Sequence, residues 1–145
     1  MRALIQRVKK AQVNVNGKTV GKINQGILAL IGIERTDNHV NADKLLKKII
    51  SYRIFSDNNN KMNNSLRDIE GDLLLVSQFT LVADTQKGLR PSFSSAGSPE
   101  LSHELFEYIV NKAKETGLKI QTGVFAADMQ VSLVNDGPVT FNLKC

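Results

Sequence analysis

The chain has 145 residues, of which 41% are hydrophobic and 23% charged, as in most globular proteins. That length suits one domain, 1–145, with a buried core, and no apolar run approaches the roughly 18 residues that a membrane span needs. The net charge of +5 permits an anionic partner such as RNA, but the basic residues form no run typical of a polybasic tail. The first ten residues become charged too quickly for a secretory signal, so we expect a cytoplasmic protein without a membrane partner.

Cysteine and histidine are too scarce for several kinds of site. Cys145 is the single cysteine, which excludes a disulfide framework within the chain and a cysteine-rich metal site. His39 and His103 each fall in a predicted helix, with no second metal ligand at a suitable spacing. Neither histidine lies in a loop of the kind that serves a Ser-His-Asp hydrolase, and the sequence holds no glycine-rich phosphate loop. We therefore expect no metal and no cofactor.

The N-terminal part of the chain has the pattern of three strands. Residues 3–15 alternate imperfectly between apolar and polar side chains around a charged bend. Asn16-Gly17 is a strong hairpin signal and leads into a second strand at 18–23. The apolar run GILALIGI at 26–33 predicts a third strand, which is buried.

A helix is predicted from a cap at Asp37 or Asn38 to about Ser51. Its apolar residues recur at helical spacing and are expected to face the core; they are Ala42, Leu45, Leu46, Ile49 and Ile50. An asparagine-rich loop follows at 56–65, and its composition favours an exposed tip over a domain boundary.

The second half of the chain predicts a long strand, a loop, a helix and more strands. Residues 71–84, GDLLLVSQFTLVAD, are predicted to form one strand whose first half is buried on both faces. After a loop at 85–97, Ser98 caps a helix that has Pro99 at its first position and stops at Gly117. Three further strands are predicted, at 119–125, 128–134 and 139–144. Strands at both ends with two separated helices favour an α+β domain with a mainly antiparallel sheet.

The segment NDGPVT at 135–140 lies between two apolar, β-branched runs and is predicted to be the turn of a hairpin. It also contains Gly137-Pro138, a dipeptide at which a cis bond costs only about 0.5–1 kcal/mol. A cis bond would aim two adjacent carbonyls the same way. A plain turn and a rigid functional loop both remain open from this segment alone.

The segment SQFTL at 77–81 places polar side chains inside an apolar strand. Alternation along a strand puts Gln78 and Thr80 on one face and the other three residues on the opposite face. A buried amide and hydroxyl need hydrogen-bond partners. Either they satisfy loop carbonyls or face water, or they form a small polar pocket that polarises a substrate carbonyl without a charged acid or base.

Four segments in order carry a resemblance to a known family: MRALIQRV at 1–8, SQFTL at 77–81, KGLRPSF at 87–93 and TGVFAADMQVSLVNDGPVT at 122–140. Together they resemble the D-aminoacyl-tRNA deacylases, the D-tyrosyl-tRNA deacylase family. The resemblance implies a homodimer of a barrel-like α+β fold with two sites at the subunit interface. It also implies hydrolysis of the ester bond of D-aminoacyl-tRNA, and of glycyl-tRNA mischarged on tRNA-Ala.

The resemblance gives the NDGPVT segment a role in selectivity. It implies that the Gly137-Pro138 peptide is cis and reaches into the partner subunit's site, where its carbonyls reject an L-side chain. One rigid obstacle of this kind excludes every L-residue at once. The family's arginine that supports this loop matches Arg7, whose alternative role is a surface strand charge.

The resemblance also implies that Ser77, Gln78, Phe79 and Thr80 form the catalytic pocket wall. Thr80 could act as a nucleophile, but the sequence shows no neighbouring base to activate it. We therefore favour attack by water, aided by the ribose 2′-hydroxyl of the substrate, with Thr80 positioning groups. A non-catalytic RNA-binding module that protects the aminoacyl end is the alternative from another class of protein.

In this family the terminal adenosine packs on a phenylalanine and a methionine that match Phe125 and Met129, although these are ordinary core residue types otherwise. Ala126 stands where the family usually has glycine, which puts the size of the adenosine pocket in question. Lys87 and Arg90 are expected to contact tRNA phosphates, or else to order their own loop.

Overall fold

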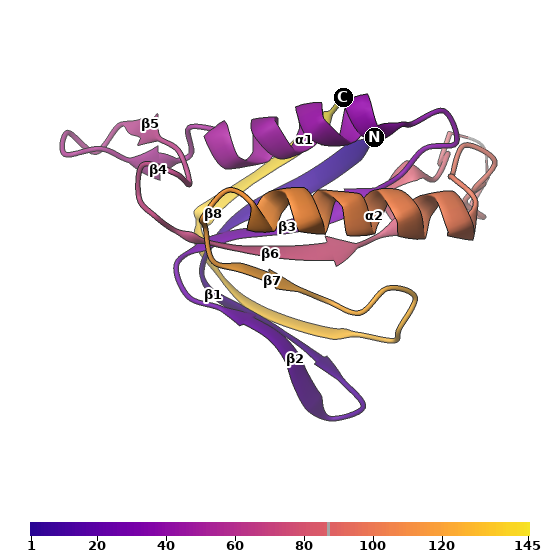
Figure 1. The fold of residues 1–145 in the computed structure, drawn as a ribbon, viewed down its shortest axis with the longest axis horizontal. Helices are drawn as coiled ribbons and strands as arrows, with labels where there is room; N and C mark the ends of the chain where they lie inside the picture. Colours follow the sequence, from indigo (N-terminus) through magenta and orange to yellow (C-terminus); the bar gives the residue numbers. More distant parts are fainter. Residues whose placement is uncertain (87) are drawn as a thin grey trace.

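The computed structural model describes residues 1–86 and 88–145. Its main sheet has the strand order β2-β1-β3-β6-β7, and β8 pairs with β1 outside this order (Figure 1). The strands of this sheet are β1 (Arg2–Val15), β2 (Lys18–Ile23), β3 (Gly26–Gly32), β6 (Asp72–Ser77), β7 (Ile120–Thr122) and β8 (Gln130–Lys144). The other elements are helices α1 (His39–Ser51) and α2 (Pro99–Lys114), the 3₁₀ helix η1 (Phe79–Val82) and the small hairpin of β4 (Phe55–Ser56) and β5 (Met62–Asn64).

The sheet curves so that the two helices lie side by side over one of its faces (Figure 1). Strand β1 runs antiparallel to β2, β3 and β8, whereas β3–β6 and β6–β7 are parallel pairs. The predicted α+β class, with a mainly antiparallel, barrel-like sheet and two helices, is confirmed. None of the helices in the described part of the chain is long and apolar enough to cross a membrane.

The central strands bury both of their faces because the sheet has apolar material on each side. One core cluster fills the space between the sheet and the helices, and it includes the whole predicted stripe of α1. A second cluster lies on the other face of the sheet; its buried members are Val8, Ala11, Val13, Ile23, Leu28, Leu74 and Val76. Hence β3 and β6 are apolar at nearly every position, as the sequence predicted.

The ends of several elements follow the predicted signals. Asn16 and Gly17 both have positive φ angles, of 49° and 76°, in the tight turn between β1 and β2. Asn38, not Asp37, caps α1, because its side chain accepts hydrogen bonds from the backbone amides at the start of the helix. Ser98 caps α2 in the same way through the Leu101 amide.

The predicted strand 71–84 is wrong beyond Ser77. Strand β6 ends there because its neighbour β3 ends at Gly32, and the Gln78 amide makes a last hydrogen bond of 2.7 Å to the Ile31 carbonyl. The chain then turns into η1. A Cβ atom on Gly32 would lie 2.9 Å from the Val82 side chain, so only glycine allows η1 to pack this closely on β3.

The predicted hairpin at 135–140 is also wrong. Strand β8 continues through this segment and pairs with β1 on both sides of it. The register passes from Gln6 opposite Thr140 to Val8 opposite Asn135, so that β8 takes five steps where β1 takes two. The Asp-Gly-Pro segment is therefore an insertion within one long strand. Its turn-forming residues allow β8 to leave the regular pairing with β1 and return to it.

Candidate active site

The polar segment Ser77 to Thr80 lies where β6 gives way to η1. The side-chain amide of Gln78 donates a hydrogen bond to the hydroxyl of Thr80, which joins the two polar groups. Phe79 is 60% exposed, an unusual position for a phenylalanine in a core-facing segment. Gln78 and Thr80 thus come together as expected, but through the turn into η1 and not through strand alternation.

A pocket of about 540 Å³ opens beside this segment. It brings Ser77, Gln78 and Phe79 together with the second expected group, Phe125, Ala126 and Met129. The remaining lining residues are Ile31, Ile33, Val76, Ala96, Gly97, Pro99, Ser102, Ala127 and Val131. Thr80 is not a lining residue and reaches the pocket only through its hydrogen bond to Gln78. Two segments more than forty residues apart therefore build one cavity.

The Phe125 side of the pocket is held by aromatic and sulfur contacts. Phe125 stacks obliquely on His103 of α2, with ring centroids 4.8 Å apart, and lies 6.2 Å from the buried Phe106. Gly123 makes room for Met129, because a Cβ there would lie 2.6 Å from the Met129 sulfur. This wall is apolar, flat and anchored in the core, and it suits a stacked ring.

Ala126 has a φ of +58°, in the left-handed region that disfavours every residue with a Cβ atom. The backbone at this position therefore explains a preference for glycine independently of the size of the pocket. With alanine at this position, the turn after Phe125 has a higher conformational energy than it would have with glycine.

The pocket has no charged wall. None of the described residues that line it has an ionisable side chain, so its polarity comes from Ser77, Gln78, Ser102 and the backbone. Phe79 and Thr80 begin a helix, so their amides have no acceptor within that helix. Among residues 1–86 and 88–145, no group of three His, Cys, Asp or Glu side chains is arranged to hold a metal ion.

The Gly137-Pro138 peptide bond is cis, and Gly137 has a φ of +131°. Arg7 holds this segment: its Nε donates to the Asp136 carbonyl at 2.9 Å, and its guanidinium lies 3.3 Å from the Asp136 carboxylate. The Arg7 side chain is 13% exposed, so it is not a solvated surface charge. Arg7, Gly137 and Pro138 do not line the pocket of their own chain.

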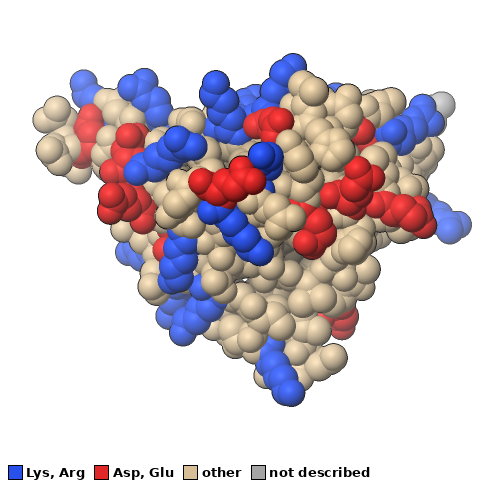
Figure 2. Space-filling model, viewed as in Figure 1, with Lys and Arg blue, Asp and Glu red and all other residues tan. Residues whose placement is uncertain are grey.

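Of the two expected tRNA contacts, Lys87 lies outside the described residues, and Arg90 is exposed between η1 and α2. Figure 2 shows Lys and Arg side chains scattered over one face and interleaved with Asp and Glu, without one basic patch. The basic character of the protein is therefore distributed on this face.

Residues 4–144 match the family model described as D-Tyr-tRNA(Tyr) deacylase. The chain belongs to this family. A D-aminoacyl-tRNA deacylase of Haemophilus influenzae (strain 86-028NP) is 62% identical over 144 residues, which are 99% of each chain. One from Pseudoalteromonas translucida (strain TAC 125) is 62% identical over 143 residues, with the same coverage. The sequence-based assignment to the D-aminoacyl-tRNA deacylases, which are ester hydrolases, is confirmed.

Solved structures share the fold of this deacylase. A structure named "c-Myc DNA Unwinding Element Binding Protein" superposes with a TM-score of 0.95 at 36% identity, covering 100% of this chain and 99% of its own. A probable eukaryotic D-amino acid tRNA deacylase superposes with a TM-score of 0.75 at 17% identity, covering 98% of both chains. At that low identity, the second likeness concerns the fold alone.

Sequence reasoning missed several residues in or beside this deacylase's pocket. Phe93, within KGLRPSF at 87–93, packs on the lining residue Phe79 with ring centroids 5.0 Å apart. Ser102 lines the pocket and His103 packs on Phe125; both come from the first turns of α2, and the sequence assigned a site role to neither. No periodicity in the sequence indicates that this helix end faces η1 and the Phe125 turn.

Proposed function

We propose that this chain, as a single domain and in the cytoplasm, hydrolyses the ester bond of D-aminoacyl-tRNA and releases the D-amino acid and free tRNA. Membership of the family supports this reaction. The observation that carries it to a site is the pocket that joins Ser77, Gln78 and Phe79 to Phe125 and Met129. An aminoacyl end needs both a polar wall for its ester and a flat apolar wall for its base.

The terminal adenine stacks on the wall made by Phe125 and Met129, next to Ala126. Aromatic stacking on an unpaired base is the common way in which proteins hold single-stranded RNA ends. The oblique contacts of Phe125 with His103 and Phe106 support this role, since they fix the ring against rotation. The ribose and its ester then extend towards Ser77 and Phe79, which lie at the other wall of the same pocket.

Hydrolysis proceeds by attack of water on the ester carbonyl, assisted by the substrate's own ribose 2′-hydroxyl. The absence of ionisable side chains among the described lining residues supports a mechanism that takes its proton acceptor from the substrate. The developing oxyanion is stabilised by the backbone amide of Phe79, which lines the pocket and has no acceptor within η1. Gln78 and Thr80 orient the reacting groups through their shared hydrogen bond.

Chirality is read by Gly137 and Pro138 of a second copy of the chain. The hydrogen bond and ion pair of Arg7 with Asp136 hold this loop in one place, which suits an obstacle better than an adaptable contact. The loop does not line the pocket of its own chain, and this supports a homodimer in which each loop enters the partner's site. A D-residue or glycine passes the obstacle, so glycyl-tRNA mischarged on tRNA-Ala is a second substrate.

The tRNA body is held through phosphates by basic side chains outside the pocket. Arg90 is exposed on the loop that contributes Phe93 to the contact with Phe79, and this supports its role beside the aminoacyl end. Lys87 is proposed for the same role from the family resemblance alone. Neither a metal nor a cofactor takes part in the proposed reaction.

Deacylation of matched D-tyrosyl-, L-tyrosyl- and glycyl-tRNA tests this proposal. We expect rapid loss of D-tyrosine and glycine while L-tyrosine is spared. Equal loss of the D- and L-forms would refute the chiral obstacle and leave a general esterase. Binding of tRNA without loss of any amino acid would instead indicate the non-catalytic RNA-binding module.

A further inference from the structure

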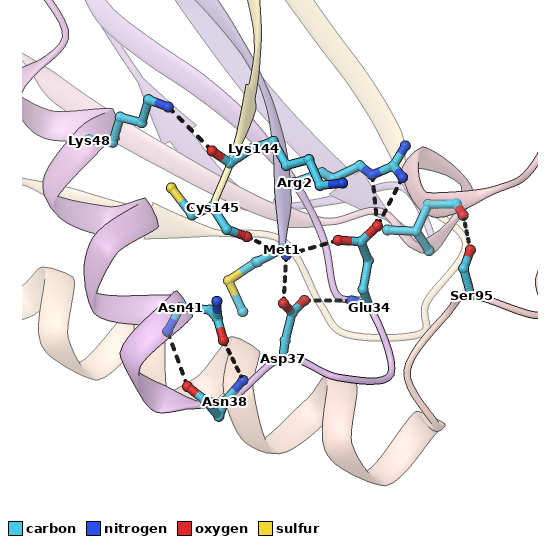
Figure 3. Close-up of polar contacts among 11 residues, drawn as sticks. Met1, Arg2, Glu34, Asp37, Asn38, Asn41, Lys48, Ser95, Lys144 and Cys145 are labelled. Carbon is cyan, nitrogen blue, oxygen red and sulfur yellow. Dashed lines mark hydrogen bonds and ion pairs between the residues drawn. The ribbon is translucent and has the colours of Figure 1, made fainter.

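The α-ammonium group of Met1 is buried at the junction of the two chain ends (Figure 3). It donates hydrogen bonds to Asp37 Oδ1 at 2.6 Å, to Glu34 Oε2 at 3.1 Å and to the Cys145 carbonyl oxygen at 2.9 Å. Met1 as a whole has no exposed surface. All three protons of the ammonium group thus have acceptors, and two of these acceptors are carboxylates.

The two carboxylates are themselves fixed by other groups. The second oxygen of Asp37 accepts the Glu34 amide at 2.6 Å, and the second oxygen of Glu34 accepts two hydrogen bonds from Arg2 at 2.9 and 3.0 Å (Figure 3). Their side chains are 5% and 16% exposed. Burial alone would raise the pKa of Glu34, but the hydrogen bonds from the Met1 ammonium and from Arg2 outweigh burial and lower it. Glu34 is therefore held in its ionised form by the two cations that it contacts.

This junction is joined to the wall of the active-site pocket through the backbone. Glu34 pairs with Ala96 in an isolated bridge, and the Gly97 amide donates to the Ile33 carbonyl at 2.9 Å. Ile33, Ala96 and Gly97 all line the pocket. The hydroxyl of Ser95 donates at 2.6 Å to the carbonyl of Val82, which is the last residue of η1. One continuous set of contacts thus leads from Met1 to η1.

We propose that the Met1 nitrogen is a site that must stay unacylated for the pocket to take its active form. An Nα-formyl or Nα-acetyl group removes the positive charge and two of the three protons, and it adds bulk where Met1 has no exposed surface. Glu34 and Asp37 then face each other without their shared cation, which strongly destabilises buried charges. The strain falls on the turn from Glu34 to Asp37 and, through the bridge from Glu34 to Ala96, on the pocket wall.

A chain that carries such an acyl group must lose it by amide hydrolysis before the Met1 contacts can form. Water adds to the acyl carbon, the bond from that carbon to the Met1 nitrogen breaks, and a carboxylic acid leaves. The nitrogen keeps the electron pair of the broken bond and takes up two protons, one from the added water and one from the carboxylic acid, so that the products are the ammonium group and a carboxylate. Only that product makes the contacts to Asp37 and Glu34.

Chemical acetylation of the whole protein measures how well the site protects its amine. Acetic anhydride is applied near neutral pH to native and to urea-unfolded protein, and peptide mass mapping follows Met1 and the exposed lysines. We expect native Met1 to react at least about tenfold more slowly than unfolded Met1, since a buried group reacts only after local opening. Equal rates would overturn the proposal.

Two single substitutions test the carboxylate contacts. Asp37→Asn removes the charge that faces the ammonium, whereas Asp43→Asn alters an exposed carboxylate of α1 that accepts a hydrogen bond from the Tyr108 hydroxyl. We expect faster native acetylation of Met1 in Asp37→Asn and an unchanged rate in Asp43→Asn. Equal protection in both variants would contradict the proposal.

Refolded protein tests the effect on the pocket, a part of the inference that rests on the proposed function. One sample is unfolded, acetylated at Met1 and refolded; the matched control is acetylated while native, then unfolded and refolded, so that only lysines differ from the untreated chain. We expect the Nα-acetylated sample to have a lower thermal midpoint and a higher KM for D-tyrosyl-tRNA, or to fail to refold. Equal midpoints and KM would overturn the proposal. If untreated protein, unfolded and refolded in the same way, lacks deacylase activity, the proposed function fails, and the midpoints alone decide the role of Met1.

Discussion

Arg7 binds two distant parts of the backbone at once. Its Nε donates to the carbonyl of Asp136 at 2.9 Å, and its Nη1 donates to the carbonyl of Ile54 at 2.6 Å. The planar guanidinium thus ties the Gly137-Pro138 insertion of β8 to the segment that follows α1. A Cβ atom on Gly137 would lie 3.2 Å from Arg7 Nη2, so the insertion packs tightly against this side chain.

Arg7→Lys is expected to weaken chiral discrimination, because a lysine cannot make the two-directional contact of a guanidinium. We expect kcat/KM for D-tyrosyl-tRNA to fall about tenfold, the effect of about 1.4 kcal/mol, and the ratio of D- to L-hydrolysis to fall as well. Arg53→Lys is a matched control, since Arg53 donates Nε to the Asn63 carbonyl at 2.9 Å on the exposed hairpin. An unchanged D-to-L ratio in Arg7→Lys would refute the role of Arg7 as a support.

Local sequence signals predicted the elements of this fold well. Helix caps at Asn38 and Ser98, the turn at Asn16-Gly17 and the apolar stripe of α1 act over three to seven residues, and that range can be read from a single sequence. The order of strands in the sheet could not be read in this way. The pairing of β1 with β8 joins the two ends of the chain, and no local pattern encodes it.

The two wrong predictions share one cause. The strand after Gly71 was extended beyond Ser77 because Phe79, Leu81 and Val82 are typical strand residues. A strand needs a neighbour to accept its hydrogen bonds, and β3 ends where this neighbour is needed. At 135–140 the opposite occurs, since β1 continues and supplies a partner on both sides of a turn-like sequence. Local propensity yields to the availability of a pairing strand.

Thr80→Val is expected to slow deacylation without abolishing it. Valine keeps the shape of threonine but removes the hydroxyl that accepts the Gln78 hydrogen bond, so Gln78 loses its orientation. We expect kcat to fall about 10- to 100-fold, as for the loss of one positioned hydrogen bond. Thr19→Val is the control, because its hydroxyl donates a hydrogen bond to the Asn14 side chain in the exposed hairpin of β1 and β2. Activity at the uncatalysed rate, together with an acyl-enzyme trapped in the native protein, would show that Thr80 is a covalent nucleophile.

Ala126→Gly is expected to stabilise the protein. A left-handed φ of +58° costs a residue with a Cβ about 1–2 kcal/mol, whereas the extra freedom of glycine in the unfolded chain costs about 0.5–1 kcal/mol. The free energy of unfolding should therefore rise by about 0.5–1 kcal/mol, measured by urea titration. Ala127→Gly, at the next residue of the same pocket, should lower it by a similar amount. A decrease in both variants would show that contacts of the Ala126 methyl group outweigh its backbone cost.

Phe125→Leu is expected to weaken substrate binding more than it weakens the fold. Leucine fills much of the same space but cannot stack on a base, and stacking contributes about 1–3 kcal/mol per base. We expect KM for D-tyrosyl-tRNA to rise about tenfold or more, with a smaller change in kcat. Phe141→Leu removes a comparable ring that packs on Tyr52 with centroids 5.2 Å apart, away from the pocket. Similar KM values in the two variants would contradict adenine stacking on Phe125.

Glu34 is expected to make the stability of the protein depend on pH in the acid range. Its pKa in the folded protein is lowered from the ordinary value of 4.5; burial acts to raise it, but the hydrogen bonds from the Met1 ammonium and Arg2 prevail. A lowered folded-state pKa stabilises the fold above the unfolded value, and this contribution is lost as pH falls through the folded value. Native protein should therefore exceed Glu34→Gln in free energy of unfolding above pH 4.5, and the difference should shrink as the pH falls further. Urea titrations across this range measure it, with the exposed Glu107→Gln as the control that shows no such trend. A difference that stays constant into the acid range would mean that Glu34 is not held ionised by Met1 and Arg2.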